Sequence, residues 1–413
     1  MPKQTPETQS SPTTETGRLQ GNGGHAGPER ESTRPARPNG SAPVEQRPQQ
    51  RIRRGRSWLR RIFVVLLVLV LLAGLGYLLG PRPSLDPANV PEPDGLPESL
   101  NELAQLISDR ESEVEGLTFG TQARVLWGDI TGHGERSELA LVYLHGFTAS
   151  RQEITPVVET AARRLNANAY FARFKGHGKD GAALKKATAQ QWLAEALEAL
   201  RIGQRLGERV VLVGTSTGAS LASWLAATYP EDVAGLVLIS PNFAPRDERT
   251  QWLTGPWGER IGRWMTDGVV EFEARNEAHA RYWTRQVPVE AVVQMMLLVE
   301  AARDAALEKV KAPVWLLYHP EDPVVQPEAM LEALQRMPNE KNRVTDISET
   351  HEPEYAHILT GRHLAKSTTN WVEHQLTAFL REAVLVAENE TSQPRKPEAS
   401  DVDPVEAEDH EDE

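Results

Sequence analysis

An apolar stretch that ends in a glycine–serine–glycine motif constrains this chain more than any other part of its sequence. Residues 210–218 run from four apolar residues into Gly-Thr-Ser-Thr-Gly, a G-x-S-x-G motif, and residues 219–227 follow with helical periodicity. A serine between a strand and a helix lies on a tight turn, where a side chain at Gly214 or Gly218 would collide with the adjoining strand or helix. We therefore predict a turn that presents the Ser216 hydroxyl at the carboxyl edge of a sheet.

This turn is a candidate site for nucleophilic chemistry. Ser216 is the predicted nucleophile, and the N–H of Thr217, at the N-terminus of the predicted helix, can face a developing oxyanion. A second amide donor is expected from Phe147, where an apolar strand ends in His145 and Gly146 and the glycine lets the backbone approach a substrate. His145 itself is expected to brace that loop. Small residues also occur in ordinary strand–helix turns, and the motif alone leaves this alternative open.

A serine nucleophile also needs a base, and an acid that orients the base. Residues 314–318 have the pattern of a buried strand, and Asp322 follows in a loop, where its carboxylate would lie beside the nucleophile at the same sheet edge. The neighbouring Glu321 is expected to be exposed. The base should come later in the chain, and His357 lies in a loop after the last predicted strand. Two other loop histidines remain alternatives, and a third lies in the last predicted helix: His351, His363 and His374.

The N-terminal part of the chain predicts attachment to a membrane. Residues 1–57 are rich in Pro, Gly, Ser, Thr, Gln and Arg, which predicts a disordered basic tail. Residues 58–80 are predicted to be a transmembrane anchor, because the uncharged run 62–80 would span roughly 28 Å as a helix, close to the hydrocarbon core of a bilayer. The arginines before this run predict a cytoplasmic N-terminus and a periplasmic or extracellular remainder. A cleaved signal peptide is the alternative, although residues 76–82 lack an A-x-A cleavage pattern.

Beyond this anchor, alternating strand and helix patterns predict the fold class. Residues 81–98 form a Pro-rich linker, and residues 99–387 are predicted to be an α/β domain with a doubly wound, mainly parallel sheet. Residues 242–311 lack a clear strand pattern but are rich in aromatic residues and methionine, which predicts a helical cap inserted over the carboxyl edge of the sheet. Residues 388–413 are acidic and are predicted to be a disordered tail.

The composition excludes several other classes of function. The chain has no cysteine, which excludes disulfides, zinc–thiolate sites and thiol nucleophiles. The net charge of −13 combines a basic N-terminal end with an acidic C-terminal end, but the dispersed acidic surface argues against nucleic acid as a partner. The sequence has no P-loop and no dinucleotide-binding fingerprint, and His351 and His357 lack the spacing of a zincin. We therefore expect neither a cofactor nor a metal.

Together these motifs resemble the α/β-hydrolase superfamily from about Leu117 to Ala387. The resemblance is closest to the monoacylglycerol lipase and carboxylesterase branch, often labelled serine aminopeptidase-like. It rests on the order and spacing of five segments: 144–148, 174–178, 214–218, 320–325 and 356–359. The resemblance implies Ser216 as nucleophile, His357 as base, Asp322 as acid, and the Phe147 and Thr217 amides as the oxyanion hole. The loop before His357 is longer and more acidic than is usual in this family.

The motifs and the resemblance predict a membrane-anchored serine hydrolase. It would cleave carboxylic esters with lipid-like or otherwise apolar acyl groups through an acyl-enzyme, and its expected partners are that substrate and the membrane, through residues 62–80. A peptidase or amidase with the same three residues is one alternative. A non-catalytic α/β-hydrolase domain that serves as a membrane-tethered binding module is the other.

Overall fold

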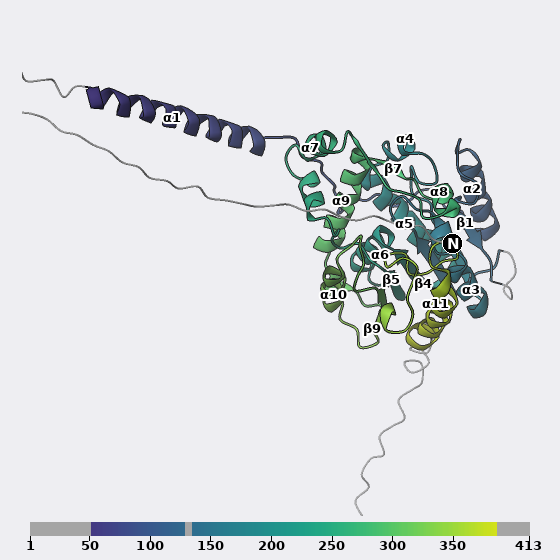
Figure 1. Cartoon of the computed structure of the whole chain (residues 1–413). Coiled ribbons are helices and arrows are strands. Elements are labelled where there is room, and N and C mark those ends of the chain that lie inside the picture. The colour runs from purple at the N-terminus through teal and green to yellow at the C-terminus, as the bar shows by residue number, and fades with distance from the viewer. Residues whose placement is uncertain (1–50, 129–133, 386–413) are drawn as a thin grey trace, which may run out of the picture. The chain divides into compact units, whose positions relative to one another are not determined.

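The computed structural model describes residues 51–128 and 134–385 (Figure 1). Most of the predicted N-terminal tail, residues 1–50, and all of the predicted acidic tail lie outside the described residues. The same holds for the last two residues of the predicted C-terminal helix. The observed helix α11 (Lys366–Phe379) continues as a π-helical turn over Leu380–Leu385, where the description ends.

A seven-stranded sheet forms the centre of the domain, with the strand order β1-β3-β2-β4-β5-β8-β9. β1 pairs antiparallel with β3, and every other pairing in this sheet is parallel. The predicted mainly parallel, doubly wound sheet is therefore confirmed. The strands are β1 (Arg124–Leu126), β2 (Ser137–Leu144), β3 (Asn168–Phe171), β4 (Gly207–Thr215), β5 (Gly235–Ile239), β8 (Val314–Tyr318) and β9 (Arg343–Asp346).

Both faces of this sheet are buried, which explains why the central strands read as continuous apolar runs. Along β2, alternate side chains point to opposite faces. Leu139, Leu141 and Tyr143 join the core under α3 (Val157–Leu165) and α11, whereas Ala140 and Val142 join the core on the other face. The helices of that second face are α2 (Leu100–Ser112), α5 (Ala189–Leu206), α6 (Thr217–Thr228), α9 (Val289–Asp304) and α10 (Pro327–Gln335).

The interval between β5 and β8 contains the predicted cap, but it is not entirely helical. Three residue pairs join β6 (Val269–Glu271) and β7 (Gln286–Pro288) in a two-stranded antiparallel sheet. The expectation of no strand here was wrong, because strands of three residues are too short to show a period-two pattern. The remaining elements of the interval are η2 (Glu248–Thr254), α7 (Gly258–Met265), α8 (Glu277–Tyr282), α9 and η3 (Leu307–Lys309).

The segment before the sheet contains a long apolar helix and an extended linker. Helix α1 (Arg51–Leu78) begins before the predicted anchor, and its part from Ser57 to Leu78 is long and apolar enough to cross a membrane. The predicted linker has no helix or strand, and it is bound to the domain. Glu92 accepts two hydrogen bonds from Arg201 of α5, at 2.7 and 2.8 Å, and these bonds lower the pKa of the Glu92 carboxyl.

Candidate active site

Ser216 occupies a strained turn between β4 and α6. Its φ is 52° and its ψ is −121°, a backbone conformation that residues with a side chain rarely adopt. The glycines on either side leave room for the turn. A Cβ at Gly214 would lie 2.5 Å from the Cα of Ala219 in α6, and one at Gly218 would lie 2.0 Å from the carbonyl oxygen of Leu144 in β2. The predicted collisions with the neighbouring helix and strand are confirmed.

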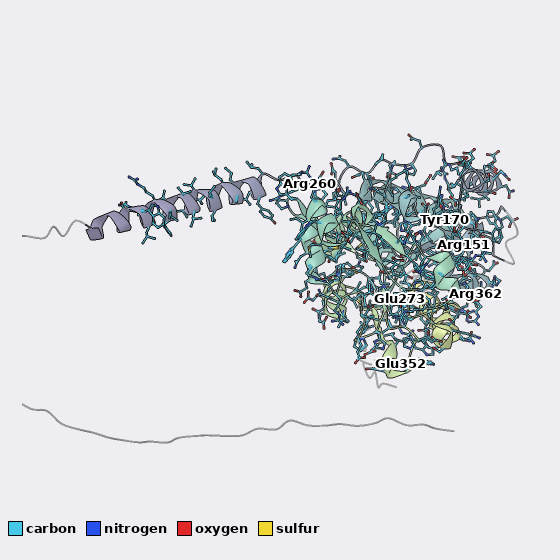
Figure 2. The ribbon with its side chains drawn as sticks, turned by 45° about the horizontal axis from the view of Figure 1, so that its top comes forward. Arg151, Tyr170, Arg260, Glu273, Glu352 and Arg362 are labelled. Atoms are coloured by element: carbon cyan, nitrogen blue, oxygen red, sulfur yellow. The ribbon has the colours of Figure 1, made fainter. Side chains whose placement is uncertain are left out.

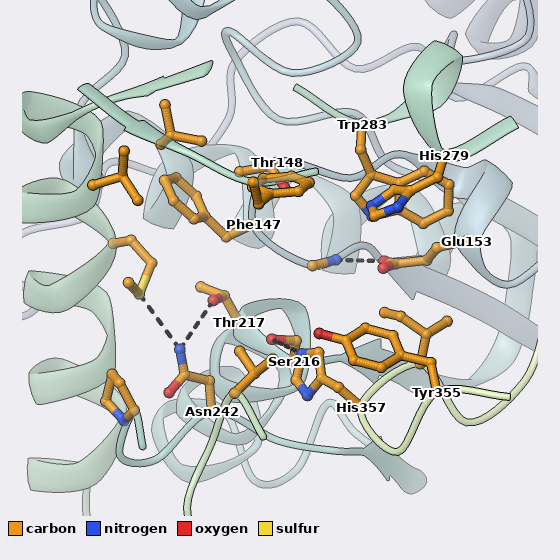
Figure 3. Close-up of a pocket in the computed structure, with 18 of the residues that line it drawn as sticks. Phe147, Thr148, Glu153, Ser216, Thr217, Asn242, His279, Trp283, Tyr355 and His357 are labelled. Atoms are coloured by element: carbon orange, nitrogen blue, oxygen red, sulfur yellow. Dashed lines mark hydrogen bonds between the residues drawn. The ribbon is translucent and has the colours of Figure 1, made fainter. Parts of the chain in front are cut away.

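The structure brings three predicted site residues into one hydrogen-bonded chain. The Nε2 atom of His357 lies 3.2 Å from the Ser216 hydroxyl (Figure 3), and its Nδ1 lies 2.8 Å from Oδ2 of Asp322. The side chain of Asp322 is fully buried, and its Oδ1 accepts hydrogen bonds from the amides of Val324 and Val325 at 2.8 and 3.0 Å. These two amides fix the carboxylate, which in turn fixes the tautomer of His357 with its proton on Nδ1 and leaves Nε2 free to accept the serine proton.

The alternative acid and base candidates lie elsewhere. Glu321 is exposed, as predicted, and its amide donates to the ring of His319. His363 contacts Gln152, and His374 is exposed on α11. His351 stacks on Trp371. The acidic residues of the long loop face solvent, with the Glu352 side chain 77% exposed (Figure 2).

The peptide group between Gly146 and Phe147 sets the direction of the Phe147 N–H. The carbonyl of Gly146 accepts hydrogen bonds from Nδ1 of His145 at 2.8 Å and from the amide of Ala149 at 3.2 Å. Because a trans peptide is planar, the Phe147 N–H points away from these donors. The other ring nitrogen of His145 accepts from the Phe174 amide, and burial lowers the pKa of His145 to about 4, so the ring is neutral. His145 therefore braces this loop, as expected.

The amide of Thr217 is the second predicted oxyanion donor. Thr217 is the first residue of α6, where an amide has no carbonyl one turn earlier to bond. The helix dipole also favours negative charge at this end. Thr217 and Phe147 line the same cavity as Ser216. Both residues whose amides were predicted as donors therefore border the space above the serine hydroxyl.

A cavity of about 750 Å³ opens over Ser216. A volume in this range accommodates a small molecule or an acyl chain. Its walls come from both the carboxyl edge of the sheet and the inserted segment between β5 and β8. The apolar lining residues are Phe147, Pro245, Val270, Phe272, Ala274, Trp283, Val287, Val292, Met295, Val324 and Ile358. The polar lining beyond the catalytic candidates includes Thr148, Glu153, Asn242, Glu273 and Arg275.

Three residues of this cavity carry no signal that sequence reasoning could have used. Asn242 lies just beyond β5, and its amide nitrogen is 3.5 Å from the Thr217 hydroxyl and 3.4 Å from the sulfur of Met295 (Figure 3). Tyr355 packs edge-on against the His357 ring. Glu153 ends a short 3-10 turn, η1 (Arg151–Glu153), and is buried although the two residues before it, Arg151 and Gln152, are polar.

Burial shifts the pKa values of Glu153 and His279, which both line the cavity. Burial raises the pKa of Glu153 to about 8, although hydrogen bonds from Gly146 and Tyr143 oppose this rise. Burial, together with the positive charges of Arg275 and Arg285, lowers the pKa of His279 to about 4. Both groups are therefore predominantly neutral at pH 7. Within residues 51–128 and 134–385, no cluster of side chains has the composition of a metal site.

Comparison with known proteins identifies the family. Residues 135–352, just over half of the chain, match the family described as serine aminopeptidase, S33. The chain belongs to this family. It is a serine hydrolase with the α/β-hydrolase fold, in the branch that contains lipases and carboxylesterases.

Two curated relatives and one solved structure illustrate its similarities. The chain is 24% identical over 211 residues to the thermostable monoacylglycerol lipase of Bacillus sp. (strain H-257), a match that covers 50% of this chain and 79% of that protein. It is 33% identical over 164 residues to a Bacillus subtilis (strain 168) protein provisionally named 2-succinyl-6-hydroxy-2,4-cyclohexadiene-1-carboxylate synthase, covering 37% and 53% respectively. A structure from the study of the metagenome-derived lipolytic enzymes LipS and LipT has 21% identity and a TM-score of 0.53, covering 64% of this chain and all of that one.

Proposed function

We propose that this chain is a membrane-anchored esterase that hydrolyses carboxylic esters with an apolar acyl group. The observation that carries the proposal is the hydrogen-bonded chain from Ser216 through His357 to Asp322, at a cavity with mostly apolar walls. We also propose the domain boundaries that the sequence predicts. Residues 99–387 form the hydrolase domain, and residues 242–311 form the cap that covers the cavity.

The geometry supports a two-step mechanism. His357 Nε2 accepts the Ser216 proton as the serine oxygen attacks the ester carbonyl, and the resulting oxyanion receives hydrogen bonds from the amides of Phe147 and Thr217. When this intermediate collapses, the C–O bond to the alcohol breaks and His357 returns the proton to the departing oxygen. A water molecule then attacks the acyl-enzyme with His357 again as base. Asp322 stabilises the imidazolium in both steps.

The cavity supports an ester with an apolar acyl chain over a peptide. The eleven apolar lining residues, from Phe147 to Ile358, would desolvate an acyl chain. A relative is named monoacylglycerol lipase, and we propose a lipid-like ester of comparable kind as the substrate. An aminopeptidase would need a carboxylate to bind a free amine. Glu273 lines the cavity, but it is exposed and lies two residues from the cationic Arg275.

Covalent labelling tests this proposal. A fluorophosphonate probe should label the full-length protein, and Ser216→Ala should abolish both labelling and hydrolysis of p-nitrophenyl esters. Ser223→Ala is a matched control, because this buried serine of α6 bonds the Ala219 carbonyl and does not line the cavity. Equal labelling of Ser216→Ala, or none of the intact protein, refutes the catalytic proposal and leaves a binding module. Faster turnover of aminoacyl-anilides than of esters would instead favour the peptidase alternative.

The membrane proposal can be tested independently of catalysis. The apolar part of α1 supports a single span, and the arginines before it support a cytoplasmic N-terminus. Because the chain has no cysteine, single substitutions can report orientation. A membrane-impermeant maleimide should label Ser112→Cys in sealed cells, since Ser112 is exposed in the hydrolase domain. Ser41→Cys, in the N-terminal tail, should be labelled only after lysis. The reverse pattern would exclude this orientation.

A further inference from the structure

The loop that carries the first oxyanion donor is held by a buried carboxyl that no step above uses. Glu153 is 3% exposed, and its side chain reaches the wall of the cavity beside the loop of Gly146 and Phe147 (Figure 3). We propose that Glu153 is a positioning residue of the oxyanion hole and that its carboxyl must carry a proton for hydrolysis. The kinetic part of this inference rests on the proposed function.

One oxygen of Glu153 connects the oxyanion loop to the strand that carries the nucleophile. Its Oε1 accepts hydrogen bonds from the Gly146 amide at 2.5 Å and from the Tyr143 hydroxyl at 2.7 Å. The Tyr143 oxygen also lies 3.1 Å from the hydroxyl of Thr215, the last residue of β4 and the neighbour of Ser216. Since a phenol has one proton to donate, Thr215 is the donor in that second bond. The carboxyl therefore links both halves of the candidate site.

This link fixes the direction of the oxyanion donor. Glu153 holds the residue Gly146 from its N–H side, in the peptide group before that of the Phe147 N–H, whereas His145 and Ala149 hold its carbonyl side, in the peptide group that contains the Phe147 N–H. With both sides held, the following N–H, that of Phe147, has little freedom to turn from the cavity. Loss of the carboxyl would leave the Gly146 amide and the Tyr143 hydroxyl buried without this acceptor, so the loop would have to shift to find another.

The other oxygen of Glu153 lies on the same side of Gly146 as the Ser216 side chain. A Cβ built on Gly146 would lie 3.2 Å from Glu153 Oε2 and 3.3 Å from Ser216 Cβ, so both atoms border the space that a side chain at position 146 would fill. Within the described part of the chain, Oε2 has no hydrogen-bond partner and no cation pairs with it. A negative charge on this oxygen would oppose the negative charge that develops on the substrate carbonyl.

The surroundings of Glu153 favour its neutral form. The titratable groups around it are Tyr143 from β2, His145 at the end of β2, and His357 across the cavity, with Glu159 of α3 beyond Tyr143. A phenol and a carboxyl cannot supply a positive charge, and burial keeps His145 neutral by lowering its pKa to about 4. Burial also raises the pKa of Glu153 to about 8. The protonated carboxyl still accepts two bonds through Oε1, and its Oε2–H can donate into the cavity.

Glu153→Gln and Glu153→Leu separate positioning from ionisation. The glutamine keeps an acceptor oxygen for Gly146 and Tyr143 and cannot ionise, so its kcat/KM at pH 7 should stay within about threefold of wild type. With a pKa of about 8, wild-type kcat/KM should fall about 30-fold relative to Glu153→Gln between pH 7 and pH 9.5. The leucine removes the acceptor and should lower kcat by about 10²- to 10³-fold with little change in KM, as loss of an oxyanion donor does.

Two kinetic results would overturn the inference. Parallel alkaline profiles of wild type and Glu153→Gln would exclude the ionisation, and a Glu153→Leu variant that keeps wild-type kcat would exclude the positioning role. If the leucine variant does not fold, the glutamine comparison still decides.

A spectroscopic readout does not depend on catalysis. The infrared difference spectrum between the Ser216→Ala protein and the same protein with the additional substitution Glu153→Gln should contain a protonated-carboxyl C=O band at pH 7 that is lost by pH 10. Absence of this band at pH 7 would refute the protonated state. Failure of the proposed function would instead appear as an unlabelled, inactive wild type.

Discussion

Replacing Ser216 by glycine should leave the protein more stable than replacing it by alanine, and both replacements should abolish the proposed chemistry. At φ 52° and ψ −121°, residue 216 has a conformation that costs on the order of 1–3 kcal/mol for any residue with a Cβ. Glycine relieves that cost, but it loses about 0.5–1 kcal/mol more backbone entropy on folding than alanine does. Ser216→Gly should therefore exceed Ser216→Ala by roughly 0.5–2 kcal/mol in the free energy of unfolding. Both variants lose the bond to His357, so that contribution cancels in the comparison.

Urea unfolding of the full-length protein in detergent measures this difference. Tryptophan fluorescence is a suitable signal, because Trp192 and Trp315 are buried in the hydrolase domain. Their fluorescence reports the unfolding of this domain and does not require α1 to unfold. The melting temperatures should differ by roughly 1–6 °C for a domain of this size. Ser220 provides the control, since it lies within the regular part of α6. There the Ser220→Gly protein should be about 1 kcal/mol less stable than the Ser220→Ala protein. If Ser216→Gly is also less stable to urea than Ser216→Ala, the turn is not strained and our interpretation of the motif is wrong.

Three further predictions concern the charged and packed groups around the serine. Asp322→Asn should lower kcat for ester hydrolysis by about 10⁴-fold, because an amide favours the wrong His357 tautomer, and a variant that keeps wild-type kcat would contradict this role. Gly218→Ala should destabilise the fold by more than about 3 kcal/mol, because its Cβ would lie 2.0 Å from the Leu144 carbonyl oxygen; a wild-type urea midpoint would refute this. Glu153 should make stability fall as pH rises from about 4.5 to 8, because the unfolded chain releases this proton while the folded chain keeps it until its pKa of about 8. The effect is at most about 4–5 kcal/mol, and Glu153→Gln unfolding curves at pH 5 and pH 8 should lack it; an equal pH dependence in both proteins would contradict it.

The sequence determined those features whose causes lie within a few residues of one another. The turn at Ser216 follows from an apolar strand, small neighbours and a helix, all within residues 210–227. The mainly parallel sheet follows from the alternation of strand and helix patterns, because parallel strands need crossover connections. The short strands β6 and β7 escaped this reasoning, since three residues cannot establish a period.

Only the tertiary structure decided which distant groups meet. Asp322 and His357 are separated from Ser216 by more than a hundred residues, and periodicity alone left three histidines open as the base. The bonds from His357 to both partners select one of them. Glu153 was invisible in the sequence because an acidic residue in a polar turn is ordinarily exposed. Its burial, its two donors and its approach to Ser216 depend on how η1, β2 and β4 pack together, and no local pattern encodes that packing.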